Sequence, residues 1–188
     1  MARLIFVTHP EVRVDLSIPV QDWSLSDTGR RRARSFAQSG ILRGVTHLWS
    51  STETKARETA AILADHTAIP VSYAPDLGEN DRSATGFLPP AEFERAANRF
   101  FAEPDQSFNG WERAIDAQSR IVSAVHRIVE QHSGGDLAII SHGAVGTLLY
   151  CHLRGLSIDR TQDQPSQGHY WTAELPALIL EHGWRSIG

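Results

Sequence analysis

The 188-residue sequence predicts a single α/β domain with three layers and a mostly parallel central sheet, of doubly wound type. Two apolar runs, Leu4–Val7 and Leu137–Ile140, are each followed by a hydroxyl residue and then a histidine, His9 or His142. Short apolar runs that end in a loop signal are typical of strands buried on both faces of a parallel sheet. Strand patterns also alternate with amphipathic helical patterns along the chain, as in βαβ units.

The first part of the chain is predicted to hold three strands and two helices. Ser26 has the place of a helix N-cap and Gly40 follows the end of that helix. Ser50 and Glu53 have the spacing of a capping box for the second helix, although two further hydroxyl residues compete for the cap. The predicted strands cover residues 3–8, 46–50 and 70–74, and the helices cover 30–38 and about 51–66.

The later part is predicted to contain an insertion followed by further strands and helices. Residues 78–110 are irregular and enclose a helix at 91–101; we interpret them as an insertion over the sheet edge, because the segment is too small for a core of its own. The whole chain, 1–188, is therefore expected to be one domain. The other predicted elements are helices 111–131 and 144–153, the strand ending at His142, and β runs at 169–173 and 177–180.

Composition sets limits on the partners of the protein. A net charge of -4 gives no general attraction to nucleic acid or to an anionic membrane, so any anion site must be local. The single cysteine, Cys151, lies in an apolar stretch and is expected to be a buried, inert thiol. With no signal-peptide pattern and no apolar run of membrane-spanning length, we expect a cytoplasmic protein.

The two histidines point to a reaction site. Ligands bind outside the carboxyl ends of strands in open parallel sheets, so His9 and His142 are expected at one edge, where they favour phosphoryl or acyl transfer. Phosphoryl transfer through histidine needs a neutral imidazole, donors around the phosphoryl oxygens and an acid. Pro10 favours an extended backbone at His9, and Gly143 opens a helix whose N-terminus would direct positive charge to this edge. Glu79, beyond the third strand, is the candidate acid.

Five motifs in order along the chain resemble those of the histidine phosphatase superfamily, which includes the cofactor-dependent phosphoglycerate mutases and many small phosphatases. The resemblance implies a phosphoglycerate mutase-like fold, a small phosphorylated substrate or phosphate ion, and no metal ion or organic cofactor. The motifs are Thr8-His9-Pro10, Leu25-Ser26-Asp27-Thr28-Gly29, the segment from Ser50 to Ala60, Leu77-Gly78-Glu79, and Ser141-His142-Gly143.

The sequence departs from the family pattern in its anion-binding positions. The two phosphate-binding arginines of the family fall at Thr8 and Lys55, and the glycine of its first signature falls at Pro10. Neither replacement offers the bidentate fork of arginine. Since a charge-assisted hydrogen bond contributes about 1.5–3 kcal/mol, loss of one arginine is expected to lower rate or affinity about tenfold to a hundredfold.

Three arginines near the motifs could compensate: Arg13, Arg57 and Arg82. Each is more often a solvated surface charge than a ligand when judged from the sequence alone. Gly143, which allows close approach of a backbone or ligand, completes the candidate substrate-binding set.

The resemblance predicts a phosphoric monoester hydrolase in which His9 forms a phosphohistidine that water then hydrolyses. His142 and Lys55 would stabilise the transferring group and Glu79 would protonate the leaving oxygen. One alternative is a catalytically weakened module that binds a phosphorylated ligand or partner without turnover. A second is a phosphomutase, for which the insertion at 78–110 is short. Whether the protein forms a homodimer stays open.

Overall fold

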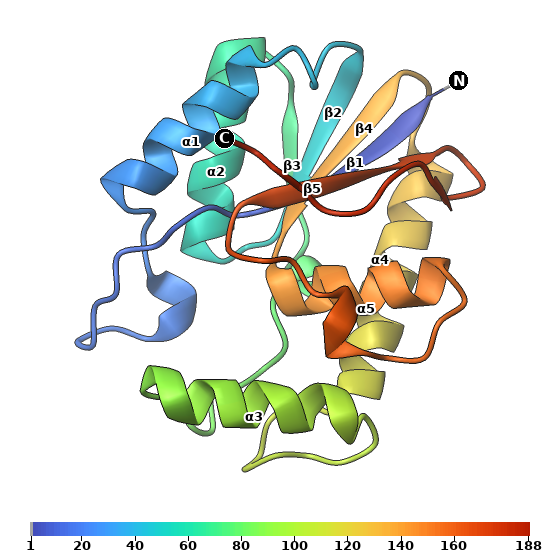
Figure 1. The fold of residues 1–188 in the computed structure, drawn as a ribbon. Coiled ribbons are helices and arrows are strands. Elements are labelled where there is room, and N and C mark those ends of the chain that lie inside the picture. The colour runs from blue at the N-terminus through green and yellow to red at the C-terminus, as the bar shows by residue number, and fades with distance from the viewer. Residues whose placement is uncertain (1) are drawn as a thin grey trace.

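The computed structural model describes residues 2–188 and consists of a central sheet between two helical layers (Figure 1). The strands are β1 (Arg3–Thr8), β2 (Val45–Ser50), β3 (Val71–Tyr73), β4 (Asp136–Ser141), β5 (His169–Glu174), β6 (Ile179–Leu180) and β7 (Arg185–Ser186). The helices are α1 (Asp27–Gln38), α2 (Thr54–Thr67), α3 (Pro90–Ala102), α4 (Ala114–Gln131) and α5 (Gly143–Leu153). Short 3-10 turns lie at Val20–Asp22, Pro75–Leu77 and Arg160–Gln162.

The strands form one mixed sheet in the order β3-β2-β4-β1-β5-β6, with β7 paired to β5. β1 to β4 are parallel, and β5 runs antiparallel beside β1. The prediction of an α/β domain with a mostly parallel sheet is therefore confirmed. In the register of β1 with β4, Thr8 lies opposite Ser141, so both strands end at the same edge.

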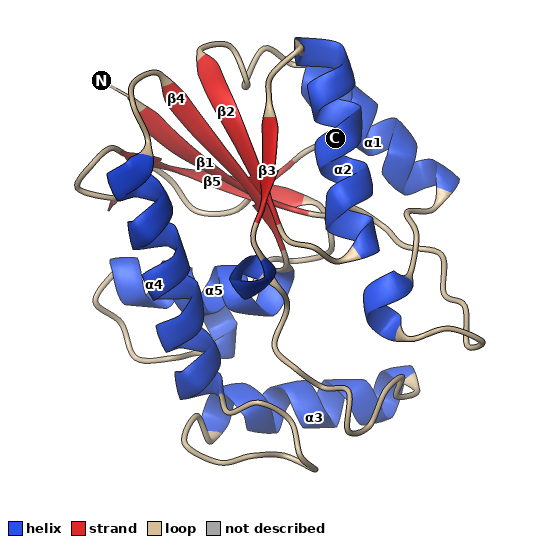
Figure 2. Cartoon of the chain, turned by 180° about the vertical axis from the view of Figure 1, so that it is seen from behind, coloured by secondary structure: helices blue, strands red, loops and turns tan. Residues whose placement is uncertain are grey.

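Side chains of β1 alternate between the two layers, as the pleat of a strand requires. Leu4 and Phe6 pack into the core shared with α4 and α5, whereas Ile5 and Val7 pack into the core shared with α1 and α2. The two helix pairs cover opposite faces of the sheet (Figure 2). On the α4–α5 side, the ring of Phe6 stacks on Trp171 of β5 with centroids 4.8 Å apart.

The segment 78–110 crosses beyond the carboxyl ends of the parallel strands, with α3 below them in Figure 1. Phe100 and Phe101 of α3 are buried in the same core as α4 and α5, together with Trp111. The segment thus shares the core of the domain, and it forms one wall over the edge where β1 and β4 end.

Element boundaries differ from the sequence prediction at three helix starts, and α1 begins at Asp27, directly after the predicted Ser26 N-cap, instead of at residue 30. α2 begins at Thr54, and Glu53 stands at its N-cap without a side-chain cap bond, so the predicted capping box is wrong. The reason is that the Glu53 carboxylate contacts other groups, described below. α4 begins at Ala114 instead of residue 111, because the Trp111 N–H donates to Phe108 within a turn and its side chain is buried.

Two short strands at the end of the chain differ from the prediction: β6 is shorter than predicted, and β7 is not predicted at all. The last β run is shorter than predicted, Ile179–Leu180, and β7 covers only two residues, which is too short to show a periodic pattern. Among residues 2–188, no helix has the length and apolar character needed to cross a membrane.

The stacked pair of Phe6 and Trp171 is expected to carry a large share of the core energy. Trp171 is fully buried, so Trp171→Ala should lower the free energy of unfolding by about 3–5 kcal/mol through lost burial and an unfilled cavity. Urea unfolding followed by circular dichroism measures this. Ile179→Ala, at a side chain 61% exposed, is the control and should change it by about 0.5 kcal/mol or less; equal losses in both variants would contradict the assignment.

Candidate active site

The two histidines meet at the carboxyl edge because of how the strands continue. The His9 N–H donates to the carbonyl of Ser141 (3.1 Å), and the Ser51 N–H donates to that of Ile140 (2.9 Å). These bonds extend the β1–β4 and β2–β4 pairings by one residue each. As a result the rings of His9 and His142 lie edge to face, with centroids 5.2 Å apart.

His9 is held in the form that a nucleophile needs. Its Nδ1 donates to the carbonyl of Pro10 (2.9 Å), which places the proton on Nδ1 and leaves Nε2 with a free lone pair. Burial lowers the pKa of His9 well below its ordinary value, and the nearby His142 and Lys55 lower it further. His9 is therefore a neutral imidazole that lines the pocket described below.

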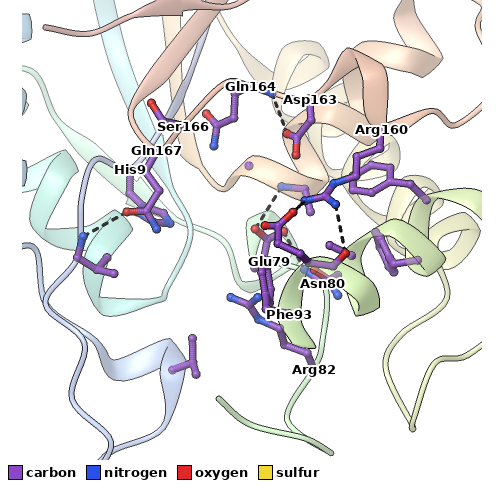
Figure 3. Close-up of a pocket in the computed structure, with 18 of the residues that line it drawn as sticks. His9, Glu79, Asn80, Arg82, Phe93, Arg160, Asp163, Gln164, Ser166 and Gln167 are labelled. Atoms are coloured by element: carbon purple, nitrogen blue, oxygen red, sulfur yellow. Dashed lines mark hydrogen bonds and ion pairs between the residues drawn. The ribbon is translucent and has the colours of Figure 1, made fainter. Parts of the chain in front are cut away.

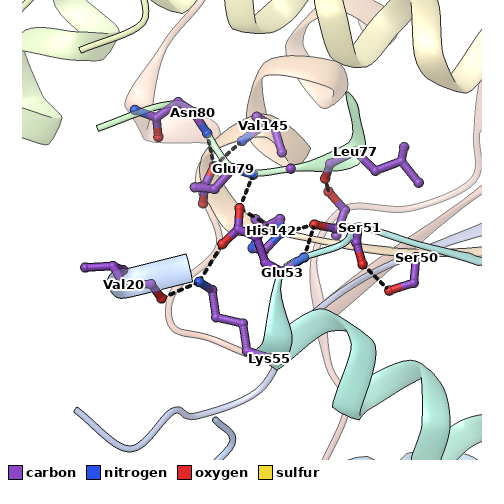
Figure 4. A network of polar contacts seen from close by, with 12 residues as sticks. Val20, Ser50, Ser51, Glu53, Lys55, Leu77, Glu79, Asn80, His142 and Val145 are labelled. Atoms are coloured by element: carbon purple, nitrogen blue, oxygen red, sulfur yellow. Dashed lines mark hydrogen bonds and ion pairs between the residues drawn. The ribbon is translucent and has the colours of Figure 1, made fainter. Parts of the chain in front are cut away.

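His142 is fully buried beside the start of α2. Its Nε2 lies 2.8 Å from the Ser51 hydroxyl and 3.4 Å from a carboxylate oxygen of Glu53 (Figure 4). Burial, followed by Lys55, lowers the pKa of His142 well below its ordinary value. Its Nδ1 is buried without a hydrogen-bond partner among residues 2–188.

Glu79 lies at the N-terminus of α5. Its carboxylate accepts the N–H groups of Ala144 (3.2 Å) and Val145 (3.1 Å). The sequence had predicted that this helix N-terminus faces the ligand; instead Glu79 already occupies these two amides. Burial raises the pKa of Glu79, which favours the protonated form required of a general acid.

The loop that carries Glu79 is held from α4. Arg120 donates to three backbone carbonyls, those of Asp76, Gly78 and Glu79, and forms an ion pair with Glu112. A side chain that bonds three carbonyls of one short loop fixes the backbone at Glu79, so the carboxyl group is positioned before any ligand arrives.

Lys55 lies inside the site, and its charge is already paired. It is 3% exposed, and its Nζ donates to the Glu53 carboxylate (2.5 Å) and to the Val20 carbonyl (2.9 Å). Figure 4 shows Lys55 and His142 on two sides of Glu53. An ammonium bound to a carboxylate has less attraction left for a phosphoryl group.

The side chain of Thr8 is also committed to internal bonds. Its hydroxyl donates to the Gln164 side-chain carbonyl (2.6 Å) and accepts the N–H of His169 (3.0 Å). Gln164 also closes the space over Gly143, where an added Cβ would lie 2.5 Å from its amide nitrogen. Thr8 therefore supports the wall of the pocket and has no free donor for a phosphoryl oxygen.

Of the three compensating arginines, the structure brings only Arg82 to the pocket. Its guanidinium lies 4.9 Å from the ring centroid of Phe93 and within the pocket lining. Arg13 is exposed and borders a separate hollow, and Arg57 is exposed over the ring of Tyr73.

The pocket beside His9 has a volume of about 320 Å³ and is bounded on one side by α3 (Figure 3). Its lining combines the predicted site residues with polar and aromatic groups from the insertion and from the loop before β5. The lining residues are His9, Val12, Val20, Trp23, Lys55, Glu79, Asn80, Arg82, Phe93, Glu94, Ala97, Phe100, Phe101, Trp111, Gly143, Ala144, Arg160, Asp163, Gln164, Pro165, Ser166 and Gln167.

Several polar groups of the site were missed by sequence reasoning. Glu53 and Asn80 stand within two residues of Lys55 and Glu79, so the motifs contained a signal for both. Asn80 is buried and its Nδ2 has no hydrogen-bond partner among residues 2–188. Asp163 belongs to no motif, so only the structure shows that it lines the pocket at the sheet edge.

Asp163 and Arg160 form the far rim of the pocket. Asp163 accepts the Thr147 hydroxyl (2.7 Å), and burial raises the pKa of its carboxyl group. Arg160 pairs with Glu94 of α3 (2.7 Å). The rim therefore ties the loop before β5 to the insertion across the mouth of the pocket.

The sequence profile of the histidine phosphatase superfamily (branch 1) matches residues 4–173. The chain therefore belongs to the histidine phosphatase superfamily.

Relatives in this family include both phosphatases and mutases. The chain is 28% identical over 171 residues to glucosyl-3-phosphoglycerate phosphatase of Mycolicibacterium vanbaalenii, covering 84% of this chain and 76% of that protein. It is 29% identical over 161 residues to a probable phosphoglycerate mutase of Yersinia enterocolitica, covering 79% and 74%.

Solved structures share the fold over nearly the whole chain. YhfR of Bacillus stearothermophilus has a TM-score of 0.82 at 23% identity, with 97% of this chain and 95% of that chain covered. A phosphoserine phosphatase of Entamoeba histolytica, solved with 3-phosphoglyceric acid, has a TM-score of 0.80 at 18% identity, with 99% and 98% covered.

The neutral state of His9 can be tested directly. At about pH 6, an imidazole with the ordinary pKa of about 6.5 is mostly protonated, whereas the lowered pKa of His9 should keep it neutral with its proton on Nδ1. Nitrogen-15 NMR of histidine-labelled protein, assigned by comparison with His9→Ala, measures both the charge and the tautomer. A charged His9 at that pH, or a proton on Nε2 of the neutral ring, would contradict the geometry.

Proposed function

We propose that this protein hydrolyses small phosphomonoesters through a phosphohistidine on Nε2 of His9. The observation that carries the proposal is the bond from His9 Nδ1 to the Pro10 carbonyl, which leaves Nε2 unprotonated on a residue that lines a pocket together with Glu79 and lies beside the buried ring of His142. Membership of a superfamily with phosphatase relatives supports the same reaction class.

The proposed reaction assigns a group to each chemical role. Nε2 of His9 attacks phosphorus while the bond to the leaving oxygen breaks, and Glu79 gives its proton to that oxygen. Water then attacks the phosphohistidine and loses a proton to the Glu79 carboxylate, releasing phosphate and restoring both residues. Positive charge on the pocket wall comes from Arg82, and from Lys55 to the extent that Glu53 leaves it unneutralised.

A second candidate is a module that binds a phosphorylated ligand without turnover. The specific observation in its favour is that Lys55 is bound to Glu53 and that Thr8 is bound to Gln164, so two positions expected to hold phosphate are occupied internally. Such a site could retain recognition through Arg82 while it lacks the charge needed to stabilise a transition state.

Replacement of the nucleophile separates the two candidates. His9→Ala should reduce turnover of p-nitrophenyl phosphate by about 10³-fold or more, because no other described group presents a free imidazole nitrogen to the pocket. Initial rates of nitrophenol release measure this.

The matched control is His66→Ala, at an exposed histidine in the last turn of α2, which should retain the wild-type rate. Wild-type protein that binds orthovanadate but shows no turnover would support the binding module instead. Equal rates in wild type and His9→Ala would show that His9 is not the nucleophile.

The role of Glu79 is tested by the leaving group. Glu79→Gln keeps the size of the side chain and one acceptor oxygen for the α5 amides but has no acidic proton to supply, so turnover of an alkyl phosphate should fall by about 10²–10⁴-fold. Turnover of p-nitrophenyl phosphate, whose leaving group needs little protonation, should fall by less than about tenfold. Steady-state kinetics with both substrates give the ratio; the same loss with both substrates would argue against acid catalysis.

A further inference from the structure

We propose that Glu53 tunes the charge selectivity of the site: by pairing with Lys55 it weakens the binding of doubly charged phosphoryl groups more than that of singly charged ones. The inference rests on the proposed function only for the location of the phosphoryl site, beside His9. It assigns to this chain a preference that none of the motifs discussed above carries.

Two donors and a neutral imidazole surround the Glu53 carboxylate. One oxygen accepts from Lys55 Nζ (2.5 Å), and the other accepts the Glu79 N–H (2.8 Å) and lies 3.4 Å from Nε2 of His142. The ammonium and the backbone amide are donors that would otherwise be available to an anionic ligand. Figure 4 shows this arrangement around Glu53.

Glu53 does not stabilise its own helix through its side chain. It stands at the N-cap of α2, yet its side chain makes no cap bond. Its side chain is 17% exposed and borders a second hollow of about 680 Å³, next to Glu79 and Asn80. The carboxylate is therefore not sealed from solvent, and its charge lies close to the site.

The charges around the site make the effect selective. Arg120 is bound to Glu112 and to backbone carbonyls, so its charge is committed to the Glu79 loop. Lys55, Arg82 and Arg160 are the cations that line the pocket; Arg160 is paired with Glu94, and Glu53 offsets the charge of Lys55. Because Coulomb energy is proportional to the charge of the ligand, a retained negative charge opposes a dianion twice as strongly as a monoanion.

The test compares two ligands with the same aryl group and different charge: phenylphosphonate, a dianion at alkaline pH, and its monomethyl ester, a monoanion. Isothermal titration calorimetry gives the affinity of each. Glu53→Gln, which keeps an acceptor oxygen for Lys55, should improve the affinity for phenylphosphonate about tenfold and that for the monoester about threefold, the square-root relation that electrostatics requires. Glu53→Ala should give the same ordering.

Two controls isolate the charge of Glu53. Glu103→Gln makes the same chemical change at an exposed ion pair of α3 and should alter neither affinity. The double variant Glu53→Met with Lys55→Met removes both charges of the pair together. Folded proteins often tolerate such a replacement of a buried ion pair. Because the net charge of the site is unchanged, the ratio of the two affinities should stay as in the wild type. Thermal unfolding shows that each variant is folded.

Other outcomes would overturn the inference. Equal improvement for both ligands would mean that Glu53 only fills space, and weaker binding of both would mean that it positions Lys55. The readout is binding, so it is independent of turnover: a protein without phosphatase activity that still shows the charge-dependent shift would refute the proposed hydrolysis and support the role of Glu53.

Discussion

The parallel pairing of β1 with β4 is the constraint on which the site depends. A parallel register makes both strands end at one edge, and the bond from the His9 amide to the Ser141 carbonyl carries that register one residue beyond the strands. The side-chain period of a strand is two residues, so a slip of one residue would exchange the two cores and turn His9 away from His142. The apolar faces of β1, packed on opposite helical layers, hold the register against such a slip. Packing on both faces of the sheet thus sets the distance between the two imidazoles.

Burial gives this edge its chemistry. The imidazoles of His9 and His142 are kept neutral by removal from water, and the carboxyl group of Glu79 is kept available for protonation by the same cause. Lys55 is also buried but carries a charge, and an isolated buried charge is costly. The Glu53 carboxylate supplies the opposite charge that Lys55 needs. Glu53 is needed to stabilise the buried Lys55 in the folded state, and the same carboxylate lowers the positive charge that Lys55 can offer to a ligand. The arrangement in the site is a compromise between these two demands.

The sequence was sufficient for the longer strands, the helices and the position of the two histidines after β1 and β4, because these follow from periodicity and from residues next to strand ends. β1 and the Ser26 N-cap of α1 agree with the structure, since apolar runs and capping residues act locally. Long-range contacts were not predictable in this way. The partner of Thr8, Gln164, is 156 residues away, and it decides what the Thr8 hydroxyl can bind. The reach of Glu53 likewise depends on a loop brought close by α4, and the helical pattern alone favoured a capping role for it.

Gln164 has a consequence for how the sequence can change over time. Its side chain fills the space between the Thr8 hydroxyl and the backbone of Gly143. An arginine introduced at position 8 would have to occupy that space, so its benefit to anion binding depends on prior loss or shortening of Gln164. A larger residue at position 143 meets the same obstacle. The effects of substitutions at these three positions are therefore non-additive, and the order in which they arise decides which mutational routes are open.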